Sequence, residues 1–219
     1  SGWFSGACSI LFYIACLIGM AMIALSFGKF AATLAGITEH FPMWERGLAS
    51  GLIIAISLLR LVGSRGANVA GRVIVIANLL LVAGFAVALS PHIQGERLAV
   101  ETWPGTVPIL GSLALTFFAF TGFEVISNTA DRMENPARDL PRAMYATIAI
   151  VIVLYVGLAV AVTGVVSEEQ LRSSGATLLA VAAKSIFGEI GFTVLLLSAV
   201  ISSVTCLNGG LFGITSTTY

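Results

Sequence analysis

Residues 108–128 read PILGSLALTFFAFTGFEVISN, and Glu124 is the only charged residue among them. An α-helix needs about 20 mostly apolar residues to cross the hydrocarbon core of a bilayer, and this run is long enough. A carboxylate at membrane depth costs about 2.5–3.5 kcal/mol on insertion scales, so such a residue usually faces a cavity or a partner. The stretch therefore predicts a membrane helix with a polar point inside it.

The composition of the whole chain also indicates a membrane protein. Of the 219 residues, 58% are hydrophobic and only 10% are charged, and the mean hydropathy is +1.00. A soluble domain has about 25% charged residues, so this chain could not cover a water-facing surface. The net charge is zero and the basic residues form no patch, which gives nucleic-acid binding no support. His40 and His92 are isolated in expected loops, so we predict no metal site and no cofactor.

Uncharged stretches of sequence mark the expected helices. Five of them are long enough to cross a bilayer, and they cover residues 1–28, 73–95, 102–123, 143–167 and 190–219. A sixth apolar run, residues 47–59, is shorter, and the alternative to a crossing there is a core helix or a re-entrant segment. At these lengths only helices satisfy every backbone polar group in lipid. We therefore expect an all-α, polytopic transmembrane helix bundle that forms a single domain over residues 1–219, with helices near residues 5–34, 45–62, 70–90, 107–133, 142–166 and 189–215.

Lysine and arginine are densest in two tight loops of this arrangement. One contains Arg60, Arg65 and Arg72, and the other contains Arg132, Arg138 and Arg142. The alternate loops carry their basic residues at lower density: Lys29, Arg46, Arg97, Arg172 and Lys184. Because basic residues concentrate on the cytoplasmic side, we predict that the two tight loops are cytoplasmic. Both ends of the chain then lie on the cytoplasmic side. We expect the membrane to be a prokaryotic-type plasma (inner) membrane.

Two further features concern packing and the chain ends. Small residues stand four positions apart in several expected helices, which lets helix backbones approach closely: Ala15 with Gly19, Gly28 with Ala32, Thr205 with Gly209, and Gly209 with Gly213. The chain starts without a methionine or a basic leader and is still apolar at its last residue. We therefore expect it to be the interior of a longer protein.

The fourth expected helix contains a plausible point of unwinding. Thr121 and Gly122 stand just before Glu124. Glycine costs about 1 kcal/mol relative to alanine inside a helix, and a threonine hydroxyl can bond to nearby backbone. Free backbone groups at mid-membrane are tolerated where they line a polar cavity, and a half-helix that starts near Glu124 would present its positive end there. The alternative is that Gly122 only allows close packing and Glu124 pairs with a structural partner.

Two motifs in order carry a resemblance to a known family. Residues 118–124 read FAFTGFE and residues 134–142 read ENPARDLPR. Together they resemble the sixth transmembrane helix and the following loop of the amino acid–polyamine–organocation (APC) permeases. Asn135-Pro136 would end that helix, and Asp139 before Pro141 would cap the next one.

Other parts of the chain resemble the same family in the same order. Residues 63–67, GSRGA, are similar to the turn between its fourth and fifth helices, and residues 208–213, NGGLFG, to the end of its eighth. The chain thus resembles helices three to eight. This resemblance implies part of a LeuT-type fold, which is built from two five-helix inverted repeats with broken first and sixth helices at the substrate site.

The resemblance also implies which residues contact substrate. The expected contacts are Phe118, Phe120, Thr121 and Gly122, with Phe118 as an aromatic lid. Among Phe118, Phe120 and Phe123 we expect one gate, and packing roles for the other two. Tyr13, in the first expected helix, would place its hydroxyl in the central cavity or bond to a neighbouring helix.

A second set of residues is expected to act in gating or coupling. Glu124 would organise the broken helix or sense pH. Ser202 and Ser203 match the place where sodium-coupled members of this fold supply hydroxyl ligands, although hydroxyls also bond across helices. Asn78 aligns with a lysine of many proton-coupled relatives and cannot supply that titratable charge.

The expected function is secondary active transport of amino acids by alternating access, coupled to protons or sodium. The expected partners are a small-molecule substrate and the lipid bilayer. The alternatives are transport of a polyamine or other organic cation, and a non-transport membrane subunit. The sequence has no catalytic pair, no His-Glu metal motif and no Gly-x-Ser-x-Gly elbow, so we predict that the protein is not an enzyme and has no catalytic residue.

Overall fold

The computed structural model describes residues 2–37, 39–62, 68–99, 103–120, 122, 126–127, 130 and 133–216. Within these residues every regular element is a helix and there is no strand, as the apolar runs predict. The chain divides into two compact units, Ser1–Leu81 with Arg172–Tyr219, and Val82–Leu171. The single domain expected over residues 1–219 stays a prediction.

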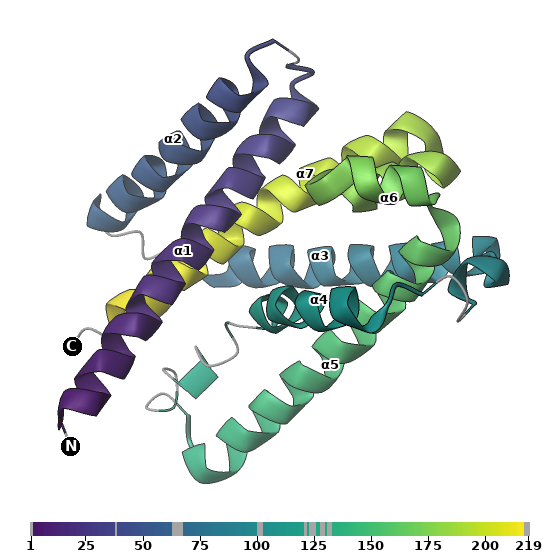
Figure 1. The fold of residues 1–219 in the computed structure, drawn as a ribbon. Helices are drawn as coiled ribbons and strands as arrows, with labels where there is room; N and C mark the ends of the chain where they lie inside the picture. The colour runs from purple at the N-terminus through teal and green to yellow at the C-terminus, as the bar shows by residue number, and fades with distance from the viewer. Residues whose placement is uncertain are drawn as a thin grey trace. The chain divides into compact units, whose positions relative to one another are not determined.

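The first unit is built around α1 (Gly2–Leu34). This helix contacts both α2 (Phe41–Val62) and α7 (Leu178–Ser216), as Figure 1 shows in purple, blue and yellow. The chain reverses direction after Leu34, so α1 and α2 lie side by side as an antiparallel pair (Figure 1). The first part of α3 (Asn68–Leu89) belongs to this unit as well.

Small residues bring α1 and α2 into close contact. A Cβ atom added at Gly28 would lie 2.1 Å from the carbonyl oxygen of Glu45, so only glycine fits there. Ala32 and Ala49 are buried beside it. The predicted close approach at Gly28 and Ala32 is therefore confirmed. At Gly209 no described atom lies within 4 Å of an added Cβ, so the same spacing there stays a prediction.

A small apolar core joins the three long helices of the first unit. Its buried members are Ala24, Ala49, Ile56 and Leu207, and partly buried residues pack against them: Met20, Ile23, Leu52, Val204 and Leu211. These residues come from α1, α2 and α7, so the core fixes the three helices against one another.

A glycine interrupts α7 near its start. Gly188 has φ 64° and ψ −152°, which is not helical, so the helix divides there and its second part begins at residue 189. Lys184 pairs with Glu189 across this point, and its ammonium lies 5.5 Å from the ring centre of Phe192. Both charged side chains are more than half exposed, so the pair adds little stability.

The second unit contains α4 (Thr106–Ala119) and α5 (Pro136–Val165), preceded by the short helices η1 (Ser90–His92) and η2 (Gly95–Leu98). The η1–η2 segment docks on the C-terminal end of α5. The Gln94 N–H donates to the Gly164 carbonyl at 2.9 Å, and the Arg97 guanidinium donates to the Val165 carbonyl. A cation at the C-terminal end of a helix also interacts favourably with the helix dipole.

Two predicted helix ends differ from the structure. The fourth helix was expected over residues 107–133, but α4 ends at Ala119, and the described residues between 120 and 133 are not α-helical. Gly122 has φ +107°, a backbone angle outside any right-handed helix.

The fifth helix begins at Pro136 rather than at 142. Asn135 takes the N-cap position, and proline fits the first helical position because its missing N–H has no role there. Asp139 therefore lies in the first turn of α5, and our assignment of Asp139 as the cap was wrong.

Among the residues that the structure describes, four helical stretches are long and apolar enough to cross a membrane: Gly6–Leu34, Gly71–His92, Pro136–Val165 and Glu168–Leu211. Neither α2 nor α4 is among them within the described chain. The α2 helix carries Glu45, Arg46 and Arg60, and the 14 residues of α4 extend about 21 Å at 1.5 Å per residue. Crossing by these two elements stays a prediction.

Candidate functional site

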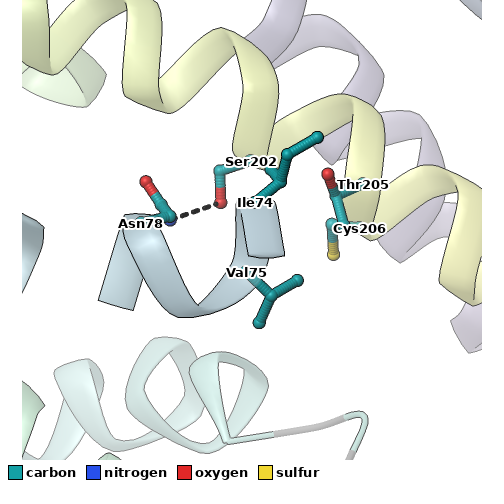
Figure 2. Close-up of a pocket in the computed structure, with 6 residues that line it drawn as sticks. All are labelled: Ile74, Val75, Asn78, Ser202, Thr205 and Cys206. Carbon is teal, nitrogen blue, oxygen red and sulfur yellow. Dashed lines mark hydrogen bonds between the residues drawn. The ribbon is translucent and has the colours of Figure 1, made fainter. Parts of the chain in front are cut away.

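The first candidate site lies between α3 and α7 and is centred on Asn78. The Asn78 side-chain oxygen accepts a hydrogen bond from the Ser198 hydroxyl, and its amide nitrogen donates to the Ser202 hydroxyl at 3.4 Å (Figure 2 shows the second bond). All three side chains are half-buried. We name these three residues the Asn78 cluster.

The spacing of the two serines explains how one amide reaches both. Ser198 and Ser202 are four residues apart on α7, so they lie one turn apart on the same helix face. An asparagine offers an acceptor and donors at once, and here it uses both functions across the helix–helix contact. The sequence singled out Asn78 and Ser202 separately, but it did not predict the hydrogen bonds that join Asn78 to Ser198 and Ser202.

An open pocket of about 230 Å³ adjoins the Asn78 cluster. Figure 2 shows its lining side chains: Ile74, Val75, Asn78, Ser202, Thr205 and Cys206. The Thr205 hydroxyl bonds to the carbonyl of Ile201 in its own helix, at 2.9 Å. The polar atoms that Asn78 and Ser202 present to the pocket therefore stand beside an otherwise largely apolar wall.

Ser203 is placed differently from its neighbour. Its side chain is buried, and its hydroxyl donates to the Ala199 carbonyl in the same helix at 2.8 Å. It is not among the residues that line the pocket. Of the two serines that the sequence singled out for coupling, the structure brings only Ser202 to Asn78.

The second candidate site is the end of α4, in the other unit. The Phe120 N–H closes the last turn with bonds to the carbonyls of Thr116 (3.3 Å) and Phe117 (3.1 Å). Gly122 then turns the chain away with its positive φ. No atom lies within 4 Å of a Cβ built at Gly122, so the backbone angle, and not crowding, requires glycine there.

A residue that the sequence did not single out contacts this helix end. The Tyr155 hydroxyl of α5 donates to the Ala119 carbonyl at 3.1 Å. Its ring meets the Phe120 ring edge to face, with centroids 5.2 Å apart and planes at 71°. Phe120 therefore packs on a neighbouring helix, which is one of the two roles expected for the aromatic residues here.

The other predicted site residues are less fully placed. Tyr13 lies on α1 with its side chain 45% exposed. Thr121, Phe123 and Glu124, and the side chain of Phe118, lie outside the described residues. Among the described residues, no group of three or more histidine, cysteine, aspartate or glutamate side chains could hold a metal ion.

Comparison with known proteins assigns the chain to a family. A family model described as amino acid permease matches residues 1–219, the whole of this sequence. The chain belongs to the amino acid permease family. It is an integral membrane protein, as its long apolar helices indicate.

Several relatives of the chain are named as transport proteins. It is 27% identical over 222 residues to the inner membrane transport protein YbaT of Escherichia coli, a match that covers 98% of this chain and 50% of YbaT. It is 26% identical to the serine/threonine exchanger SteT of Bacillus subtilis, over 95% of this chain and 47% of SteT.

A third relative is the branched-chain amino acid permease BcaP of Bacillus subtilis, which is 28% identical over 157 residues. That match covers 65% of this chain and 34% of BcaP. The chain thus spans about half the length of YbaT and SteT, and about a third of BcaP.

Proposed function

We propose that the full-length protein is a secondary active transporter that moves amino acids across the membrane by alternating access. The observation that carries this proposal is the permease match over the whole chain. The relatives named for serine/threonine exchange and for branched-chain amino acids support the substrate class. Transport is proposed for the full-length protein, because this chain spans about half of such relatives. An enzymatic role is not part of the proposal.

We further propose that the substrate binds where α4 ends. The carbonyl groups at the C-terminal end of a helix form its negative end, and each can accept a second hydrogen bond, which suits the ammonium group of an amino acid. The early end of α4 at Ala119 and the turn at Gly122 support this placement. Phe118, Phe120, Thr121 and Tyr13 remain the proposed side-chain contacts, with Glu124 as the organising or pH-sensing carboxylate.

The Asn78 cluster is the proposed coupling element. Its three side chains are neutral, so none can carry a proton in the way that a lysine or a carboxylate can. Their oxygens are of the kind that binds sodium in proteins, which makes sodium the more suitable coupling ion at this position. Ser203, whose hydroxyl bonds to its own helix, is less suited to this role than Ser202.

An uptake experiment tests the proposed function. Full-length protein in proteoliposomes would be given radiolabelled neutral and cationic amino acids, and polyamines, under separate sodium and pH gradients. We expect accumulation of an amino acid, driven by sodium more than by protons. Uptake of polyamines alone would favour the organic-cation alternative. No uptake by correctly folded protein would contradict transport of either class.

Two glycine-to-alanine substitutions, one at the site and one as a control, test the broken-helix site. Gly122→Ala should raise the apparent KM or abolish uptake, because a side chain at φ +107° costs about 1–3 kcal/mol and shifts the turn. The matched control is Gly111→Ala, which lies inside α4 with no atom within 4 Å of the added Cβ. It should leave uptake unchanged, since alanine favours a helix. Equal uptake kinetics in both variants would remove Gly122 from the site.

A further inference from the structure

The last carbonyl groups of α4 do not all find partners in the same way. Within a helix, the final four carbonyls have no intrahelical N–H to accept from. The Phe120 N–H serves two of them, those of Thr116 and Phe117. The Ala119 carbonyl accepts instead from the Tyr155 hydroxyl at 3.1 Å, and Tyr155 lies 36 residues further along the chain. A second helix thus supplies the donor at this helix end.

Tyr155 makes a second contact with the same place through its ring. The rings of Tyr155 and Phe120 meet at 71° with centroids 5.2 Å apart, the edge-to-face geometry that aromatic pairs prefer. One side chain therefore contacts both the backbone of Ala119 and the side chain of Phe120. Ala119 is the last residue of α4, and Phe120 stands two positions before Gly122, where the backbone takes its positive φ.

We propose that Tyr155 is a positioning residue of the substrate site. The inference rests on the proposed function, in which the end of α4 binds the amino acid. Tyr155 acts through Ala119 and Phe120: its hydroxyl fixes the direction of the last α4 carbonyl, and its ring fixes the plane of Phe120. It presets the binding geometry before the substrate arrives, which lowers the cost of binding.

The hydroxyl and the ring can be separated by substitution. Tyr155→Phe removes only the hydroxyl and keeps the ring contact with Phe120. Tyr155→Leu removes both contacts. Tyr145→Phe is the matched control, because Tyr145 lies on the same helix with its side chain 75% exposed. All three variants would be made in the full-length protein.

The experiment measures KM and maximal rate of amino-acid uptake in proteoliposomes, together with the thermal unfolding midpoint in detergent. We expect Tyr155→Phe to raise KM about 3- to 10-fold, the change that corresponds to one neutral hydrogen bond, with little change in the unfolding midpoint. Tyr155→Leu should raise KM further. Tyr145→Phe should match the wild type.

The outcomes separate the two proposals. If the wild type takes up amino acids but Tyr155→Phe keeps the wild-type KM, the positioning role is wrong and the proposed function stands. A lower unfolding midpoint with an unchanged KM would make Tyr155 a structural residue only, which also overturns the inference. If the folded wild type takes up no amino acid, both proposals fall together. Should Tyr155→Leu not fold, Tyr155→Phe still decides.

Discussion

Two glycines set local geometry in this protein for different reasons. At Gly28 the reason is space, because a Cβ would lie 2.1 Å from the carbonyl oxygen of Glu45 on the facing helix. At Gly122 the reason is the backbone angle, φ +107°, and no described atom lies within 4 Å of an added Cβ. Alanine at Gly28 must push two helices apart, whereas alanine at Gly122 must change the path of one chain.

The crowded glycine gives a stability prediction. Gly28→Ala should destabilise the protein by about 1–3 kcal/mol, the usual cost of overpacking, because the atoms it meets belong to backbone that cannot rotate away. The measurement is thermal unfolding of the detergent-solubilised protein, with size-exclusion chromatography as the readout of the folded fraction. Gly51→Ala, at an open position of α2, is the control and should be neutral or slightly stabilising.

Equal unfolding midpoints for the two variants would show that α1 and α2 can separate at little cost. The close approach at Gly28 would then not be a main determinant of how these helices pack.

At the scale of elements, the Asn78 cluster is a polar link between α3 and α7. A double-mutant cycle with Asn78→Ala and Ser202→Ala should give a coupling energy of about 0.6 kcal/mol and no more than about 1.7, the range for hydrogen bonds between membrane helices. The value is small because the freed serine can bond to its own helix backbone. The coupling energy is calculated from the free energies of unfolding of the wild type, the two single variants and the double variant.

Ser203 provides the matched control for that cycle. It is adjacent to Ser202 on α7, but its hydroxyl bonds to the Ala199 carbonyl. The Asn78–Ser203 cycle should therefore give no coupling. Equal coupling in both cycles would mean that Asn78 acts on α7 as a whole and not through a specific hydrogen bond.

The ends of the helices could be predicted from sequence where nearby charged residues or prolines determine them. The helices α1, α2 and α3 overlap the uncharged runs, although α1 continues through Lys29 to Leu34 and α2 includes the charged residues at both ends of its run. The start of α5 at Pro136 shows the limit of this reasoning. Two prolines, Pro136 and Pro141, could each occupy the first position, and the helix uses the earlier one while accommodating the other.

The candidate site was predictable only in part, for a physical reason. A lone charge and a Thr-Gly pair stand out in an apolar run, so the α4 region could be singled out from sequence, whereas Asn78 was singled out by the family resemblance. Tyr155 could not, because a single tyrosine in a long membrane helix looks the same whether it faces lipid or a helix end. Its role depends on a contact 36 residues away along the chain.

At the scale of the molecule, the contacts within each unit agree with the predicted topology. In the second unit, the η1–η2 segment bonds to the C-terminal end of α5 at Gly164 and Val165. In the first unit, the Lys29 ammonium lies 3.5 Å from a Cβ built at Gly175, next to the start of α7. Within each unit, segments predicted to be extracytoplasmic thus lie together.

Cysteine labelling tests this topology in whole cells. The three native cysteines form no disulfide bond and can be replaced by serine or alanine. Glu96→Cys and Glu134→Cys would then introduce single thiols at two exposed positions on opposite sides of the predicted topology. A membrane-impermeant maleimide should label position 96 in intact cells, and position 134 only after the cells are opened. The reverse pattern would invert the assigned orientation.

The contact between α1 and α2 has a mechanical consequence. At Gly28 no flexible side chain separates the two helices, and backbone meets backbone. A force applied along one helix is therefore transmitted to the other without being absorbed by rotamer changes. We therefore expect the α1–α2 hairpin to move as one rigid lever in any conformational cycle.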